Sequence, residues 1–383
     1  MPDVPMRVGI NATALLSPRT GIGQYVYYLG QELLQSDDVE PSFFYANQWG
    51  KQVRSEPLAH ISTIKAYIKR YVPHPYVVSR CLMQMRFTTG LLRNPVDLYH
   101  EPNYLAYRFS GPLVVTVHDA SWVRHPETHP AERLDAISRY FQRSLEGASA
   151  ILTDSEFVKR EMIELFSVPP EKIFPVLLGV SPDFFPHDSQ TCRDFLAEQQ
   201  LTFGSYVLSV GTLEPRKNIP ALIDAYSMLP VALQNRFPLV LVGMRGWLTS
   251  GLEARMKPLV ERGVVKPLGY VHDAAMPLVY SGAAAFVFPS LYEGFGLPVL
   301  EAMACGVPVI SSRTSSLPEV VGNAGVLVDP HDVDALAESL RRVLEDRTFR
   351  EQLGPRGLQQ AAGFSWKQTA AATIDVYRRV LAA

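Results

Sequence analysis

The stretch from Phe288 to Ser312, FPSLYEGFGLPVLEAMACGVPVISS, most constrains how this chain can fold. It begins at the end of an apolar run, residues 283–288, which is long enough for a buried strand. Gly294 and Gly296 then interrupt regular structure, and Pro298 suits the first turn of a helix, because its missing N–H would have no partner there. The stretch therefore predicts a strand, a glycine loop and a helix, in that order.

This arrangement predicts a binding site for a phosphate that is flanked by sugars. A helix N-terminus carries roughly half a positive charge and directs N–H groups outward, so it attracts anions. The two glycines let the backbone approach an anion closely. Glu293 and Glu301 would repel a bare phosphate, and we therefore expect them to bind hydroxyl groups of the ligand. The alternative is a packed strand, loop and helix with a solvated glutamate on either side.

The residues EGFGLPVLE resemble the donor-site motif of retaining GT-B glycosyltransferases, family four of the glycosyltransferase classification. The resemblance implies that Glu293 contacts the donor sugar and that Glu301 holds the ribose of the nucleotide. It also implies that the diphosphate is held by the backbone of Gly294, Phe295, Gly296 and Leu297. The fold that it implies is α/β, with two doubly wound Rossmann-like domains facing a central cleft.

The length of the chain fits this fold, because 383 residues are enough for about two to three domains. We expect residues 1–185 to form an acceptor-binding Rossmann-like domain and residues 186–365 a Rossmann-like domain for the nucleotide-sugar donor. The resemblance implies that the last helix, residues 366–383, crosses back to the first domain. The net charge of −2 argues against a nucleic-acid partner.

The cysteines and the apolar segments favour a cytoplasmic protein. Cys81, Cys192 and Cys305 lie far apart without metal-ligand spacing, which is typical of buried thiols in a reducing compartment. No signal peptide is visible at the N-terminus. No uninterrupted apolar stretch approaches the ~20 residues that are needed to span a bilayer.

A second glycine pair, Gly21 and Gly23, follows an expected first strand at residues 6–10. A G-x-G at this place suggests a dinucleotide site, but Val26 stands where the third glycine should be, and the preceding loop is too long. In the resembled family, a glycine loop here faces the cleft and contacts the phosphate or the acceptor. The alternative is a plain turn that leads into a helix over residues 25–34.

The segment from Pro57 to Val96 contains no acidic residue. Its basic residues alternate with aliphatic and aromatic ones, and they are Lys65, Lys69, Arg70, Arg80, Arg86 and Arg93. Arranged on helices, this composition predicts a basic amphipathic surface that suits anionic lipid headgroups. A solvated helix face within the domain is the alternative.

Polar residues lie at the ends of two expected strands of the first half. Residues 97–104 are expected to form a strand that ends in a loop, and residues 113–117 the next strand. In open α/β sheets, ligands bind beyond the carboxyl ends of the strands. These strand ends therefore supply five candidates for the site, namely His100, Glu101, Asn103, His118 and Asp119. The resemblance places His118 beside the donor sugar.

The second half repeats the plan of strand, loop and helix, and Arg216 and Lys217 lie in its first loop. A diphosphate carries more negative charge than one helix N-terminus offsets, and a guanidinium with an ammonium group supplies the difference. The resemblance places the backbone of the loop with Val271 against the base, with Asp273 nearby. Asp332 and Asp334 imitate a metal-binding DxD, but helix capping explains them better, and we expect neither a metal nor a cofactor.

The segments GTLEPRKN and PSLYEGFGLPVLEAMACGVPV resemble bacterial mannosyltransferases of surface polysaccharide assembly. The resemblance implies GDP-mannose as the donor and a glycan or lipid-linked oligosaccharide as the acceptor. One alternative is an NAD-dependent oxidoreductase, which the missing third glycine argues against. The other is a non-catalytic sugar-nucleotide-binding protein, which the set of Glu293, Glu301, Arg216, Lys217 and His118 argues against.

Overall fold

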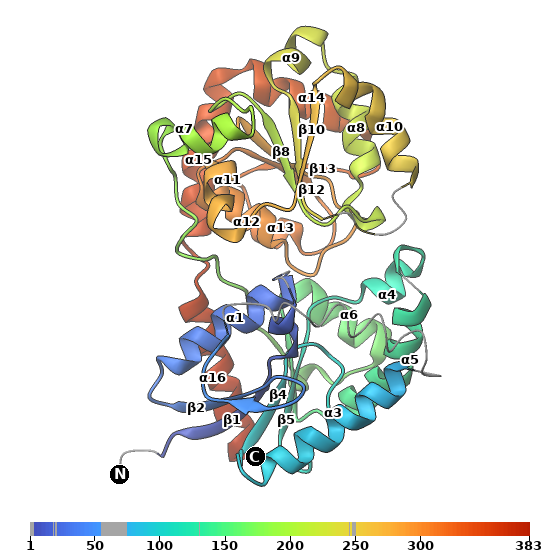
Figure 1. Cartoon of the computed structure of the whole chain (residues 1–383), viewed down its shortest axis with the longest axis vertical. Helices are drawn as coiled ribbons and strands as arrows, with labels where there is room; N and C mark the ends of the chain where they lie inside the picture. The colour runs from blue at the N-terminus through green and yellow to red at the C-terminus, as the bar shows by residue number, and fades with distance from the viewer. Residues whose placement is uncertain are drawn as a thin grey trace. The chain divides into compact units, whose positions relative to one another are not determined.

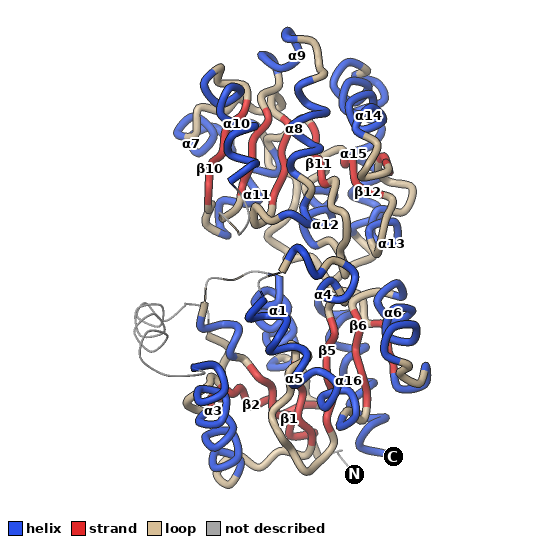
Figure 2. Tube along the Cα trace, turned by 90° about the vertical axis from the view of Figure 1, so that its right-hand side faces the viewer, coloured by secondary structure: helices blue, strands red, loops and turns tan. Residues whose placement is uncertain are grey.

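The computed structural model describes residues 4–17, 19, 21–54, 75–129, 131–244, 246 and 250–383. The chain divides into two compact units, and Figure 2 shows strands with helices around them in each. The first unit comprises Met1–Asp119, Glu132–Gly179 and Trp366–Ala383, and the second comprises Ala120–Ala131 and Val180–Ser365. Both units are built on parallel sheets, so the expected pair of Rossmann-like domains is confirmed.

The division between the units differs from the expected boundary at residue 185. It falls after Gly179, and the next residue, Val180, donates its N–H to the Phe364 carbonyl at 3.4 Å within the second unit. Residues 120–131 also belong to the second unit, where the Ala120 N–H donates to the Tyr292 hydroxyl at 2.9 Å.

The sheet of the first unit has the strand order β3-β2-β1-β4-β5-β6-β7. Its pairs are parallel, except that β3 runs antiparallel to β2. The strands are β1 Met6–Asn11, β2 Val39–Phe44, β3 Trp49–Gly50, β4 Leu98–Glu101, β5 Leu113–Val117, β6 Ala150–Thr153 and β7 Ile173–Pro175. The helices are α1 Gly21–Leu34, α3 Pro75–Leu91, α5 Ala131–Gly147, α6 Glu156–Phe166 and α16 Trp366–Ala382, with short 3-10 turns η1 Thr13–Leu16 and η3 Pro170–Lys172.

Helix α1 begins at Gly21, so Gly21 and Gly23 lie in its first turn rather than in a loop before it. The expected helix start at Tyr25 was wrong. The N–H groups of a first turn have no intrahelical partner in any case, and one glycine costs a helix only about 1 kcal/mol, so two glycines do not stop the helix there. Helix α16 packs against α1 within the same unit.

The sheet of the second unit is parallel, in the order β10-β9-β8-β11-β12-β13. Its strands are β8 Val207–Val210, β9 Leu239–Val242, β10 Val265–Gly269, β11 Ala285–Phe288, β12 Val309–Ser312 and β13 Val326–Val328. Its longer helices are α7 Ser189–Glu198, α8 Ile219–Ser227, α10 Ser250–Glu261, α12 Leu297–Ala304, α14 Val333–Glu345 and α15 Arg347–Ala361. The shorter ones are α4 Ser121–Arg124, η2 Pro126–Thr128, η4 Pro215–Lys217, α9 Val231–Arg236, η5 Asp273–Ala275, α11 Met276–Ser281 and α13 Leu317–Val321. Figure 1 labels most of these elements.

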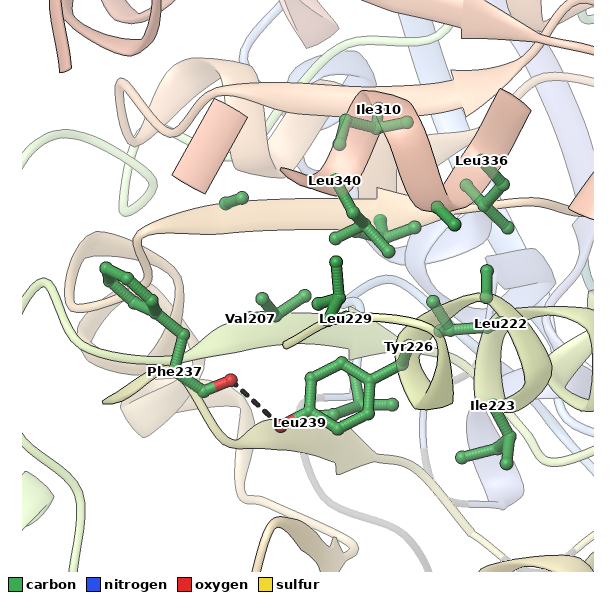
Figure 3. Packing of buried hydrophobic residues seen from close by; sticks show 14 of the residues in the cluster. Val207, Leu222, Ile223, Tyr226, Leu229, Phe237, Leu239, Ile310, Leu336 and Leu340 are labelled. Carbon is green, nitrogen blue, oxygen red and sulfur yellow. Dashed lines mark hydrogen bonds between the residues drawn. The ribbon is translucent and has the colours of Figure 1, made fainter. Parts of the chain in front are cut away.

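A buried apolar cluster fixes the strands of the second unit against helices α8 and α14 (Figure 3). Leu239 of β9 packs there with Tyr226 of α8 and Leu340 of α14. The Tyr226 hydroxyl donates a hydrogen bond at 3.1 Å to the Phe237 carbonyl, so its one polar atom is satisfied inside the core. The cluster holds β8 and β11 side by side, and their carboxyl ends therefore start neighbouring loops.

Part of the basic segment 57–96 lies outside the described residues, which resume at Pro75 after residue 54. Lys65, Lys69 and Arg70 fall in that gap. Arg80, on α3, donates to the carbonyls of Leu105 and Ala106 at 3.0 and 2.7 Å, so it is not part of an outward basic face as expected. Among the described helices, none has the length and apolar character to cross a membrane.

Candidate functional site

The loop between β11 and α12 is the centre of the candidate site, and the expected strand, glycine loop and helix are present. Gly296 caps α12 with φ of +118°, a backbone conformation that side chains disfavour. A Cβ atom at this position would also lie 2.7 Å from Leu317 Cδ2. Pro298 occupies the first turn, as expected. The backbone angle therefore favours glycine at 296, and a side chain there would also force Leu317 to shift.

Hydroxyl side chains at the end of β12 and just after it hold this loop in place. They come from the run SSRTSS at residues 311–316, which bonds the backbone of residues 288–295. The bonds are Ser312 Oγ to the Ser290 carbonyl at 2.6 Å, Thr314 Oγ1 to the Leu291 carbonyl at 3.2 Å, the Glu293 N–H to Ser315 Oγ at 2.9 Å, and Ser316 Oγ to the Glu293 and Phe295 carbonyls at 2.8 and 2.9 Å. We did not identify these residues from the sequence, although a run of hydroxyl side chains at the end of an apolar stretch is present there.

The carboxylate of Glu293 lies between two cationic side chains. Lys217 Nζ donates to Oε1 at 2.6 Å, and Arg216 Nη1 donates to Oε2 at 2.8 Å. A second carboxylate, that of Glu214, accepts from Arg216 Nη2 at 2.7 Å. Burial by itself would raise the pKa of Glu293, but the charges of Arg216 and Lys217 outweigh it and lower the pKa to about 2. Glu293 is therefore ionised at every physiological pH.

Backbone contacts fix the loop of Arg216 and Lys217 to the loop of Glu293. The Arg216 carbonyl accepts the Leu291 N–H at 2.9 Å, and Arg216 Nη1 also donates to the Tyr292 carbonyl at 2.6 Å. Lys217 Nζ lies 5.0 Å from the centroid of the Phe288 ring, at the end of β11. The structure thus brings together the two cations and the glycine loop at one edge of the sheet, as the sequence predicted.

Glu301, on α12, has the opposite protonation state to Glu293. Its Oε2 accepts a hydrogen bond from the Tyr280 hydroxyl at 2.8 Å, and no cation is among its recorded partners in the described part of the chain. Burial raises the pKa of Glu301 to about 8, although the Tyr280 hydrogen bond opposes the shift. Glu293 and Glu301, which belong to the same sequence motif, therefore differ in charge at neutral pH.

The loop after β10 holds the two residues that were expected near a nucleotide base. Val271 and Asp273 are both partly exposed there, and Asp273 begins the turn η5.

Further along the chain, at the start of α14, Asp332 Oδ1 accepts the Ala335 N–H at 2.8 Å, so its expected role as a helix cap is confirmed. Among the described residues, no three His, Cys, Asp or Glu side chains are grouped as metal ligands would be.

In the first unit, both ring nitrogens of His118 are engaged by protein atoms. Nδ1 bonds Asp154 Oδ2 and Nε2 bonds the Pro102 carbonyl, each at 2.8 Å. Burial lowers the pKa of His118, but the charge of Asp154 outweighs it, so the pKa is raised. Because neither ring nitrogen is available to take a proton from a substrate in this arrangement, His118 is not placed to act as a general base.

Two further candidates, His100 and Glu101, are fully buried parts of the core of the first unit. His100 bonds the hydroxyls of Tyr377 and Thr116 at 2.6 and 2.8 Å, and burial lowers its pKa to about 3, so it is neutral. Glu101 accepts from Asn11 Nδ2 at 2.8 Å, and burial raises its pKa to about 7. His100 therefore links the sheet to helix α16 and is a structural residue rather than a site residue.

The family models match both halves of the chain. Residues 19–184 match Glycosyltransferase Family 4, and residues 198–360 match Glycosyl transferases group 1. The O-antigen chain mannosyltransferase B of Escherichia coli is 39% identical over 371 residues, which cover 94% of this chain and 96% of that protein.

More distant relatives agree with this match. The MMP alpha-(1->4)-mannosyltransferase of Mycolicibacterium hassiacum is 30% identical over 316 residues, which cover 76% of this chain and 72% of that protein. The fold is similar to that of sucrose-phosphate synthase from Thermosynechococcus elongatus, with a TM-score of 0.75, 22% identity, and coverage of 98% of this chain and 99% of that one.

Proposed function

This chain belongs to the family 4 glycosyltransferases of the GT-B fold, and from that premise we propose that it moves mannose from GDP-mannose to a hydroxyl of a surface-polysaccharide acceptor. The proposal includes retention of the anomeric configuration. Mannose is supported by the relatives from Escherichia coli and Mycolicibacterium hassiacum, both of which are mannosyltransferases. The group of Arg216, Lys217 and Glu293 is the observation that carries the proposal.

In the proposed reaction, the bond between the sugar carbon C1 and the diphosphate oxygen breaks while the acceptor oxygen bonds to C1. Arg216, Lys217 and the N-terminus of α12 stabilise the negative charge that develops on the departing diphosphate. Glu293 stays ionised beside them and accepts hydrogen bonds from sugar hydroxyls. No protein nucleophile is needed if the acceptor attacks from the side of the leaving group, whose oxygen then takes the acceptor proton.

The remaining residues would hold the parts of the donor that do not react. Glu301, oriented by Tyr280, binds the ribose, and the loop with Val271 and Asp273 contacts the base. The proposal keeps His118 beside the donor sugar, with its ring bonded to Asp154 and Pro102. The first turn of α1, in which Gly21 is exposed and Gly23 is buried, is proposed to face the phosphate or the acceptor.

The test is a donor screen with GDP-mannose, UDP-glucose, ADP-glucose and NAD. We expect GDP-mannose hydrolysis, unaffected by EDTA, and thermal stabilisation by GDP. A nucleotide at ~100 times its dissociation constant adds roughly 2.7 kcal/mol to the free energy of unfolding. Stabilisation by NAD alone would support an oxidoreductase, and GDP binding without turnover of any donor would support a non-catalytic binding protein.

A lipid-linked acceptor would place the enzyme at the inner face of the plasma membrane, and the proposal includes docking there through α3. The described part of this helix exposes Leu82, Met85 and the following Leu92, which are 48%, 59% and 85% exposed. Arg86 and Arg93 are exposed beside them. An apolar stripe beside basic side chains suits an anionic lipid surface.

The membrane proposal predicts that the protein co-sediments with vesicles that contain anionic lipid, and less so as salt increases. Each Lys or Arg near such a surface contributes about 1 kcal/mol, so replacing Arg86 and Arg93 by alanine should weaken binding about tenfold or more. Arg347→Ala, which removes an exposed arginine from α15, is the matched control and should change nothing. Equal binding to neutral and anionic vesicles would contradict the proposal.

A further inference from the structure

The side-chain charges of Arg216, Lys217 and the carboxylates bonded to them cancel. Two cations, Arg216 and Lys217, face two carboxylates, Glu214 and Glu293. The four side chains are between 9% and 14% exposed, so water screens them little. A diphosphate that entered this neutral group would face as much negative as positive protein charge. A diphosphate that binds here therefore competes with these two carboxylates for the cations.

The two carboxylates are not held equally. Glu293 accepts from both cations, and its backbone N–H is fixed by Ser315 Oγ at 2.9 Å. Glu214 has one recorded side-chain bond among the described residues, from Arg216 Nη2 at 2.7 Å. It is also adjacent to the turn η4, on the same loop as the guanidinium that it holds. Glu214 is therefore the carboxylate that a phosphate displaces with the smaller loss of hydrogen bonds.

We propose that Glu214 is a positioning residue that holds Arg216 and competes with the nucleoside diphosphate for the same guanidinium. This inference rests on the proposed function, since it takes the diphosphate to bind at Arg216 and Lys217. The competition weakens binding of the diphosphate product, whose terminal phosphate gains an ionisable oxygen when the sugar leaves. Glu214 thereby favours release of the product.

Isothermal titration with GDP tests the competition in Glu214→Gln. Glutamine keeps the carbonyl oxygen that accepts from Arg216 but removes the negative charge, so the guanidinium stays oriented while its competitor is weakened. We expect the GDP dissociation constant to fall about five- to twenty-fold, because a like charge is removed from beside the phosphate. Uncharged guanosine should bind as it does to the wild type. Glu198→Gln, at an exposed position on α7, is the matched control and should leave GDP binding unchanged.

Kinetics give a second readout that a merely structural residue would not produce. If Glu214 promotes product release, Glu214→Gln should lower KM for the donor and kcat together, with stronger inhibition by GDP. Glu214→Asp, which keeps the charge, should bind GDP within about twofold of the wild type, so a gain of affinity as large as that expected for the glutamine variant would overturn the charge competition.

The outcomes separate this inference from the proposed function. Unchanged or weaker GDP binding in a folded Glu214→Gln protein overturns the competition and makes Glu214 a residue that orients Arg216 toward the ligand. Failure of the wild-type protein to bind any nucleoside diphosphate overturns the proposed function, and this inference falls with it.

Discussion

Replacing Lys217 by alanine is expected to weaken GDP binding about ten- to a hundred-fold, because a charge-assisted hydrogen bond contributes about 1.5–3 kcal/mol. Turnover should fall about a hundred-fold or more, since the charge on the departing diphosphate grows as its bond to the sugar breaks. Titration calorimetry and steady-state kinetics measure the two effects. Lys257→Ala, which removes an exposed lysine from α10, is the matched control.

Lys217 also holds Glu293, and a double-mutant cycle separates this role from phosphate binding. If Lys217 binds the phosphate, its removal should weaken GDP binding at least as much in Glu293→Gln as in the wild type, because Lys217 then has no carboxylate partner to share its charge. If its role were confined to orienting Glu293, the loss of affinity would largely disappear in the Glu293→Gln background. That second result, with the variants folded by circular dichroism, would contradict the phosphate assignment.

Glu293→Gln and Glu301→Gln are expected to impair the enzyme in different ways. Glu293 is ionised and fixed beside the proposed diphosphate site, where a contact with the sugar ring strengthens as the ring gains positive charge, so its loss should lower kcat. Glu301 lies further along α12 and is proposed to hold the ribose, which does not change during the reaction. Its loss should raise KM and leave kcat nearly unchanged. If both variants lose only affinity, Glu293 is a binding residue rather than a catalytic one. If Glu301→Gln lowers kcat and leaves KM unchanged, the two roles are reversed.

The pH dependence gives an independent check on Glu301. Its raised pKa of about 8 means that the ligand-free protein holds it protonated at neutral pH. The carboxylate, with two accepting oxygens, is the better partner for the two ribose hydroxyls. In the wild type, kcat/KM for the donor should therefore rise as pH increases through about 8, and in Glu301→Gln this rise should be absent. Glu293, with a pKa of about 2, should contribute no titration in this range.

Short-range rules let the sequence determine much of the fold. Strand β5 spans residues 113–117 as its apolar run predicts, and helix α16 begins at the predicted residue, Trp366. Ser155 accepts the Val158 N–H at the start of α6, which is a contact between near neighbours in the chain. The glycine loop between β11 and α12 follows equally from local chemistry, because glycine and proline act on the backbone at their own positions. The sequence motif also led to Glu293, Glu301, Arg216 and Lys217.

Only the tertiary structure decided the charge states and the support of the site. Glu293 is ionised because Arg216 Nη1, 77 residues earlier in the chain, lies 2.8 Å from its Oε2. Glu301 is protonated because packing excludes water from it and its side-chain partner, the Tyr280 hydroxyl of α11, is neutral. The engagement of both His118 nitrogens by Asp154 and Pro102 depends in the same way on neighbouring strand ends. Desolvation and ion pairing depend on which atoms surround a group in space, and that is set only when distant segments pack together.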